Sequence, residues 1–153
     1  MSTLDKVIQL LGHSENDDRV RALLGELNVA LPLQRPPRGE DQINVTIDGE
    51  PLELCFVEAD SLPSRNDDLM EGELVLDTVF LHQQREHADA IDSLPFGLSM
   101  STSRAEMRKK FGQPSWSSPV LNNDRWVISS VQVLACFSDD EGSIEQLAFS
   151  LPQ

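Results

Sequence analysis

A helix with both ends marked, followed at once by strand-like runs, constrains the fold of this chain most strongly. Ser103 and Glu106 have the spacing of a capping box, in which the serine hydroxyl and the glutamate carboxylate satisfy backbone N–H groups that a helix start leaves open. Gly112 suits the left-handed residue that ends many helices, and Pro114 prevents continuation. The sequence therefore predicts a helix that begins after Ser103 and stops at Gly112.

Three strand-like runs follow this helix. They cover residues 125–129, 131–138 and 143–151, and they are rich in apolar and β-branched side chains. The polar turn 139–142 (DDEG) joins the last two runs and is typical of a β-hairpin. The segment 94–152 is thus predicted to be one helix followed by antiparallel strands.

The first part of the chain shows a similar order of elements. Apolar residues at helical spacing predict a helix at about 4–11 and a second helix after a capping segment at 14–17. A long acidic interruption at 58–72 precedes the last strand of this part, and the polar segment 83–93 is interpreted as a linker. Alternating apolar residues predict the strands themselves, at 43–47, 52–56 and 73–81.

The two parts resemble each other, which favours a tandem repeat. In each part a helix is followed by a Cys-Phe strand, at Cys55 and at Cys136, and by a last strand led by glycine. We predict an α+β fold of two tandem units, 1–82 and 94–153, each a short helix or helical hairpin followed by a three- to four-stranded antiparallel sheet. Because one such unit buries little apolar area, the two are expected to form one compact unit, with a continuous sheet and helices on one face as one arrangement.

The net charge of the chain limits the classes of partner that it is expected to bind. Its 153 residues include 26 acidic and 12 basic side chains, which gives a net charge of −14 and a pI near 4.4. Phosphate-bearing surfaces would repel such a chain, so nucleic acid and membranes are not expected as partners, whereas a basic protein is the natural complement. No apolar run approaches the roughly twenty residues that cross a bilayer, and the start of the sequence lacks the pattern of a secretory signal. We therefore expect a cytoplasmic protein in which Cys55 and Cys136 are reduced and packed as small apolar residues.

Several segments resemble a known family. The stretches LPFGLSMSTSRAEMRKKFGQPSWSSP and NDRW, the turn FSDDEG, and the opening LDKVIQLLGHSENDDRVRALLGEL are similar to small bacterial immunity proteins encoded beside polymorphic toxins of the Rhs and type VI secretion kinds. The repeated helix and sheet is also similar to the architecture of β-lactamase inhibitor proteins and a related outer-membrane lipoprotein fold. Unlike those proteins, this sequence shows us no signal peptide, lipidation cysteine or paired disulfides.

This resemblance implies a function. It implies a protein that binds a cognate bacterial toxin and neutralises it by stoichiometric occlusion, with a secreted effector domain as the expected target and a nuclease as one candidate activity. The alternative is an adaptor or chaperone-like module that binds an effector for secretion without neutralising it. A monomer is favoured. No position matches a known contact motif, so the resemblance supplies no binding residues.

The sequence offers no motif for catalysis, so an enzyme, a cofactor and a metal are not predicted. His82 and His87 lack the third converging ligand that a zinc site needs. The turn 139–142 lacks the alternating oxygen ligands of a calcium loop. Neither cysteine has a histidine nearby in the sequence that would activate it as a nucleophile.

Surface charge and tryptophan suggest the contact residues. The interruption at 58–72 is longer than most loops without structure, and such loops often bind partners, although a solvated loop without a binding role fits the acidic run equally well. Trp116 lies among serines and is expected to contact a partner, whereas Trp126 is expected in the core. The predicted partner-binding residues are Glu58, Asp60, Asp67, Asp68, Glu71, Trp116, Asp139, Asp140 and Glu141.

Overall fold

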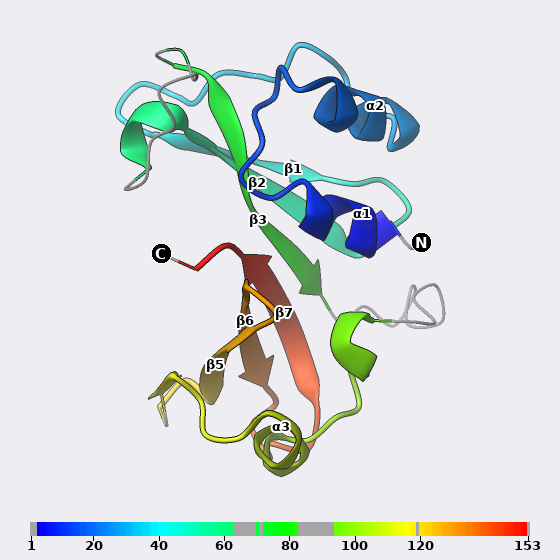
Figure 1. Cartoon of the computed structure of the whole chain (residues 1–153), viewed down its shortest axis with the longest axis vertical. Helices are drawn as coiled ribbons and strands as arrows, with labels where there is room; N and C mark the ends of the chain where they lie inside the picture. Colours follow the sequence, from blue (N-terminus) through cyan, green and yellow to red (C-terminus); the bar gives the residue numbers. More distant parts are fainter. Residues whose placement is uncertain (1–2, 63–69, 71, 83–93, 119, 153) are drawn as a thin grey trace.

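The computed structural model describes residues 3–62, 70, 72–82, 94–118 and 120–152. Within these residues the chain forms three α-helices and one seven-stranded antiparallel sheet, which confirms the predicted α+β class (Figure 1). The strands are β1 (Gln42–Thr46), β2 (Leu52–Glu58), β3 (Leu74–His82), β4 (Trp116–Ser118), β5 (Asn123–Ile128), β6 (Val131–Phe137) and β7 (Ile144–Ser150).

The sheet is continuous across both parts of the chain. Its strand order is β1-β2-β3-β7-β6-β5-β4, and every neighbouring pair is antiparallel. The first three strands and the last four each run back and forth in sequence order, and the two groups join where β3 pairs with β7. In that pair Thr78 lies opposite Ser150, and His82 lies opposite Gln146.

The helices are α1 (Thr3–Gln9), α2 (Asp18–Glu26) and α3 (Arg104–Phe111). The capping box of α3 is confirmed, since the Glu106 N–H donates to Ser103 Oγ at 3.1 Å and the Ser103 N–H donates to Glu106 Oε1 at 3.2 Å. Gly112 follows with φ of 83° and ψ of −162°, so the predicted helix end is confirmed, but its conformation differs from the left-handed helical one that was predicted. Asp17 caps α2 by accepting a 2.8 Å hydrogen bond from the Arg19 N–H.

One face of the sheet carries the hydrophobic core. In β6, Val133 and Ala135 belong to the core, while Leu134 between them faces away, as the alternation of a strand requires. Figure 1 shows α1 and α2 beside β1–β3 and α3 beside the other end of the sheet. The three helices contribute to the same core cluster, with Val7, Leu24 and Met107 respectively. No helix within the described ranges is both long and apolar enough to cross a bilayer.

The structure corrects several predicted boundaries. The strand β4 was not expected, because the run Trp-Ser-Ser has no apolar alternation. The first helix ends at Gln9 instead of residue 11, because the next N–H groups bond three residues back, as in a tight last turn. Glu58 is the last residue of β2, and Ala59–Ser61 forms a 3₁₀ turn, so the acidic interruption starts later than predicted.

The two cysteines are both free, but they differ in burial. Cys55 is buried, as predicted, whereas Cys136 is only half-buried, and neither belongs to the core cluster. The predicted linker 83–93 lies outside the described residues, as do the candidate contact residues Asp67, Asp68 and Glu71.

Candidate partner-binding surface

A row of side chains crosses the face of the sheet opposite to the core, where none of the described α-helices lies. Residues directly opposite each other in neighbouring strands point to the same side. Leu134 faces away from the core, so the residues in register with it do so too. At about 4.8 Å between strands, the row is roughly 24 Å long. It consists of Trp116, Arg125, Leu134, Ala148, Phe80 and Glu53, and we call it the outer row.

The middle of the outer row, formed by Leu134, Ala148 and Phe80, is apolar where a solvated sheet face is normally polar. Leu134 and Phe80 are half-buried by their neighbours, and Ala148 between them is only 8% exposed. One flanking row is mostly polar, with Gln132 opposite Ser150. An apolar strip with polar margins has the composition of a protein–protein interface.

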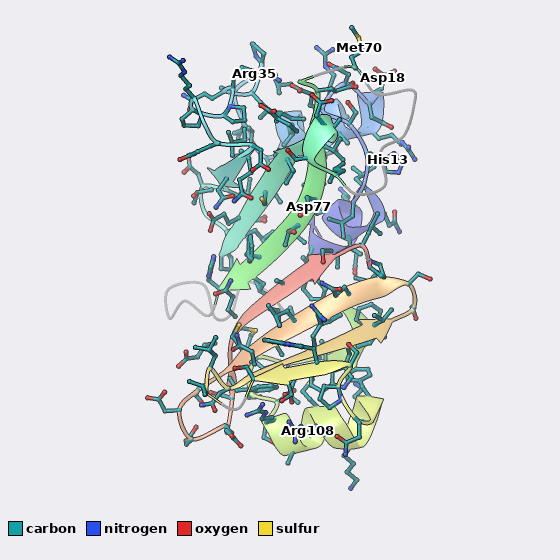
Figure 2. The ribbon with its side chains drawn as sticks, turned by 90° about the vertical axis from the view of Figure 1, so that its left-hand side faces the viewer. His13, Asp18, Arg35, Met70, Asp77 and Arg108 are labelled. Atoms are coloured by element: carbon teal, nitrogen blue, oxygen red, sulfur yellow. The ribbon has the colours of Figure 1, made fainter. Side chains whose placement is uncertain are left out.

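One end of the outer row is acidic. Glu53 lies 3.2 Å from His82 Nε2, and the His82 ring stacks on Phe80 with centroids 6.4 Å apart. Burial, and then the nearby carboxylates of Asp77, Glu53 and Asp41, raise the pKa of the Cys55 thiol to about 11. Figure 2 shows Asp77 on β3, and the Thr78 hydroxyl donates to it at 2.8 Å. The charges of these three carboxylates therefore act on Cys55 in this part of the sheet.

The other end of the outer row is aromatic. The Trp116 side chain is 42% exposed, and the Arg125 guanidinium carbon lies 5.5 Å from its ring centre, within cation–π range. Trp126 is buried as predicted, and its Nε1–H donates to the Gly112 carbonyl at 3.0 Å. Trp116 is thus the tryptophan that remains accessible, and its contact with a partner stays a prediction.

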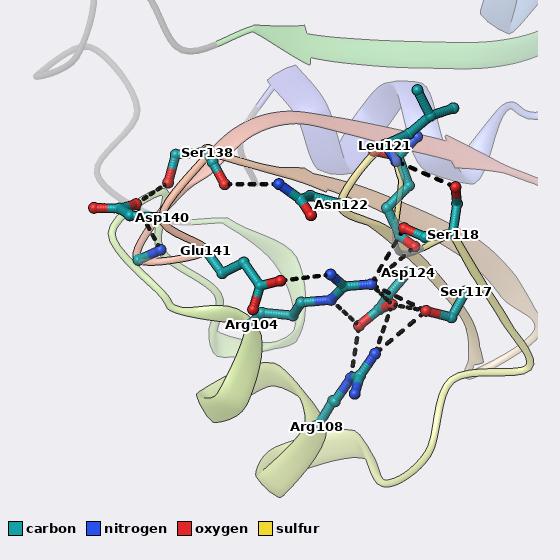
Figure 3. A network of polar contacts seen from close by, with 12 residues as sticks. Arg104, Arg108, Ser117, Ser118, Leu121, Asn122, Asp124, Ser138, Asp140 and Glu141 are labelled. Carbon is teal, nitrogen blue, oxygen red and sulfur yellow. Dashed lines mark hydrogen bonds and ion pairs between the residues drawn. The ribbon is translucent and has the colours of Figure 1, made fainter.

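A buried ion-pair network fixes the hairpin of β4 and β5 beneath α3 (Figure 3). Asp124 is fully buried, and its two carboxylate oxygens accept hydrogen bonds from Arg104 at 2.7 and 3.1 Å and from Arg108 at 2.9 and 3.1 Å. The Ser117 hydroxyl donates to the same carboxylate at 2.7 Å. Arg104 also reaches Glu141 at 3.0 Å. One helix therefore holds β4, β5 and the β6–β7 turn in fixed positions.

Sequence reasoning missed this network. Arg104 and Arg108 are four residues apart, so they lie on one face of α3, and that spacing was the available signal. Their partner Asp124 lies twenty positions after Arg104 in the sequence. In the structure, Asp124 accepts two hydrogen bonds from Arg104. Only the tertiary fold brings the three side chains together.

The network gives Asp124 an unusual response to acid. Burial alone would raise the pKa of Asp124, but hydrogen bonds from Arg104, Arg108 and Ser117 outweigh burial and hold the pKa well below its usual value of 3.8. We expect the Asp124 carboxyl carbon to keep the chemical shift of the ionised form at about pH 3 in a carbon-13 NMR titration of the folded chain. The same carbon in the urea-unfolded chain should titrate normally. Because the unfolded state then binds more protons, the stability from this site is complete at neutral pH and is lost as the pH falls below about 4. Normal titration of Asp124 in the folded chain would contradict this.

The structure places the predicted acidic residues at two distant sites. Glu58 ends β2, and Asp60 accepts a 3.3 Å hydrogen bond from the Gly72 N–H. Met70 of this segment and Arg108 of α3 lie at opposite ends of the molecule in Figure 2. The described acidic residues of this segment, Glu58 and Asp60, therefore lie far from the β6–β7 turn.

Residues of the β6–β7 turn mostly have internal partners. Asp140 accepts from the Ser138 hydroxyl at 2.6 Å and from the Gly142 N–H at 2.9 Å, and these bonds lower its pKa. Glu141 pairs with Arg104. Asp139, Asp140 and Glu141 are all exposed, and Glu141 also belongs to the network through its ion pair with Arg104.

Comparisons with known proteins leave the function open. No model of a known protein family matches the chain, and no curated protein sequence matches it. Among solved structures, it is similar to the crystal structure of a DUF4309 family protein, YjgB, from Bacillus subtilis subsp. subtilis strain 168. The sequence identity is 8%, the TM-score is 0.43, and the alignment covers 97% of this chain and 92% of that one. The functional conclusion therefore rests on the residues of this chain.

Proposed function

We propose that this protein is an immunity protein that binds a basic bacterial toxin domain in the cytoplasm and neutralises it by one-to-one occlusion. The observation that carries the proposal is the outer row, an apolar strip on the open face of the sheet that ends among the carboxylates of Glu53 and Asp77. A solvated face needs no such strip. The chain's net charge of −14 favours a basic partner over a second copy, because two copies would repel each other.

The two ends of the outer row are suited to different tasks. Carboxylates at the Glu53 end would attract a basic partner over a distance and raise the association rate. Trp116 at the other end is a large, rigid side chain of the type that dominates interface energies, and its burial would slow dissociation. A toxin docked across the row would be covered over a wide area, which is the requirement for occlusion.

We also propose that the two parts of the chain are structural repeats. Matched irregularities support this: β2 has a bulge between Cys55 and Phe56, and β6 has one between Cys136 and Phe137. In both parts this phenylalanine lies opposite a residue whose N–H donates a hydrogen bond to a backbone carbonyl in the segment before a helix, α2 in the first part and α3 in the second. Leu76, opposite Phe56, donates to the His13 carbonyl at 3.0 Å, and Ile144, opposite Phe137, donates to the Met100 carbonyl at 2.8 Å.

The pairing of β3 with β7 agrees with such a repeat. Phe80 comes four residues after Leu76, and Ala148 comes four residues after Ile144, so Phe80 and Ala148 are equivalent positions of the two units. They lie directly opposite each other in the sheet. A twofold axis relating the two units would pass through this pair. Phe80 and Ala148 are also neighbours in the outer row, so a partner docked there would contact both units.

The proposed function is tested by pairing the chain with the toxin encoded beside its gene. We expect co-expression to protect cells from that toxin, and a purified one-to-one complex to survive moderate salt. Capture of the toxin without protection would instead establish the adaptor function. Failure to bind the toxin would contradict the proposal. So would binding that is lost at moderate salt in the same way as the binding of unrelated basic proteins.

Trp116→Ala should weaken the complex strongly. We expect the dissociation constant to rise by about 30-fold, equivalent to about 2 kcal/mol, because a tryptophan at an interface commonly contributes that much. The free energy of unfolding should change by less than about 0.5 kcal/mol, since the side chain is accessible. Titration calorimetry and urea unfolding measure the two quantities. Leu31→Ala is the control, because Leu31 is 40% exposed and lies outside the sheet. An equal loss of affinity in both variants would show that Trp116 does not contact the toxin.

The double substitution Glu53→Gln with Asp77→Asn should slow association. Loss of two carboxylates weakens the attraction of a basic partner, so we expect the association rate at low salt to fall by up to about tenfold and to depend less on salt. Stopped-flow fluorescence at several salt concentrations measures both effects. Asp18→Asn with Glu26→Gln removes the same charge from α2 and should have a smaller effect. Identical salt slopes for the two double variants would contradict a role for the acidic end.

A further inference from the structure

The exposed apolar side chains of this protein are concentrated in one hairpin. Val120 is 88% exposed and Leu121 is 65% exposed, at the loop between β4 and β5. Of the seven exposed large apolar residues within the described ranges, four lie between positions 116 and 127. Such high exposures mean that the two side chains make few contacts with the rest of the chain. We call Val120 and Leu121 the apolar tip.

The apolar tip is held in a defined conformation. The Leu121 N–H donates to Ser118 Oγ at 3.3 Å, and the Asn122 carbonyl accepts from the Phe137 N–H at 2.9 Å. Directly below, Asp124 is locked by Arg104 and Arg108. Residues such as Leu121 and Asn122, whose backbone groups are already hydrogen-bonded, lose little conformational entropy on binding, which favours a role in recognition.

The loop that carries the apolar tip is connected to the acidic β6–β7 turn, and Figure 3 shows Leu121 and Asp140 on opposite sides of this connection. The Asn122 side-chain amide donates to the Ser138 carbonyl at 3.4 Å, which ties the β4–β5 loop to the β6–β7 turn. That turn exposes Asp139 and Asp140. Both loops therefore lie at the same end of the sheet, with the apolar and acidic side chains on its two sides, away from the middle of the outer row.

We propose that the apolar tip and the acidic turn together form a second contact, which enters a cleft of the same toxin that has an apolar wall and a cationic rim. This inference rests on the proposed function and deepens it by naming the chemistry of the toxin surface. A flat sheet face covers a convex surface, whereas two exposed side chains at a loop end fill a pocket. The carboxylates of the acidic turn match lysine or arginine at its rim, as expected of a toxin that binds a phosphate-bearing substrate.

The test compares the wild-type chain with three variants against the purified toxin domain. Val120→Asp with Leu121→Asp places charges in the apolar part of the cleft, and we expect the dissociation constant to rise at least about 30-fold with an unchanged unfolding midpoint. Leu31→Asp is the control, since Leu31 is 40% exposed and lies outside the sheet, and it should bind like wild type. Asp139→Lys should weaken binding most at low salt, because it reverses one charge facing the rim.

A photo-crosslinking residue at position 120 gives an independent measurement. We expect it to crosslink to a toxin segment that contains lysine or arginine, and toxin substrate in excess should suppress the crosslink. If wild type binds the toxin but the tip variant binds equally well and position 120 gives no crosslink, the second contact is wrong while the proposed function stands. If the wild-type chain binds no toxin, the proposed function fails and this inference fails with it.

Discussion

Asp124→Ala should lower the free energy of unfolding by about 3–5 kcal/mol, which is the usual cost of removing one partner from a buried ion pair. The Asp124 carboxylate is fully buried and accepts hydrogen bonds from Arg104, Arg108 and Ser117. Arg104 is itself only 5% exposed, so its charge would remain in the interior with Glu141 as its remaining acidic partner in the network. Urea unfolding followed by Trp126 fluorescence measures the loss.

Two comparison variants separate this effect from side-chain loss in general. Asp139→Ala removes an exposed carboxylate from the neighbouring turn, and its effect should stay within about 0.5 kcal/mol. Asp124→Leu combined with Arg104→Met removes both charges and should cost less than Asp124→Ala alone, because no buried charge is left without a partner. A cost of less than about 1 kcal/mol for Asp124→Ala would show that water or rearranged side chains replace the carboxylate.

The features that sequence predicted correctly are those set by nearby residues. The start of α3 follows from the reciprocal bonds between Ser103 and Glu106, and its end follows from Gly112. The strand β6 follows from the alternation of its residues between core and surface. Each of these depends on residues within one element, so the pattern alone is sufficient.

The features that sequence missed depend on contacts between elements. The strand β4 has only three residues and is recognised by its pairing with β5, because its own composition favours a loop. The outer row joins five strand pairs in register, and a change of one position in any pair would turn its residues to the core face. Charge counting directed attention to the acidic loop, whereas register places Phe80, Ala148 and Leu134 in one line.

The candidate site was therefore predicted only in part. Trp116 could be selected because a tryptophan among serines is unusual, and the structure leaves it accessible. Glu141 was selected for its charge, but that charge is shared with Arg104, which a sequence does not reveal. Val120 and Leu121 were not selected, because two apolar residues in a sequence give no sign of whether they are covered.

Phe149→Ala should destabilise the whole chain by about 3–5 kcal/mol in a single transition. Phe149 is fully buried in β7, and it lies opposite Val79 of β3 and opposite Val133 of β6. It therefore packs where the strands of the two parts meet. If the two parts share one core, removal of this ring weakens both of them together.

Two probes can follow the two parts separately in urea. Both tryptophans, Trp116 and Trp126, lie in the second part, so fluorescence reports on that part alone. In a Cys136→Ser background, thiol labelling of the buried Cys55 reports on the first part. We expect coincident transitions by both probes, in the parent and in Phe149→Ala, because cooperative unfolding has no populated intermediate.

Val127→Ala, at a 54% exposed position of β5, should shift neither transition appreciably. Separate midpoints for the two probes would mean that each part unfolds independently, and a toxin docked across the outer row would then have to hold the two parts together itself.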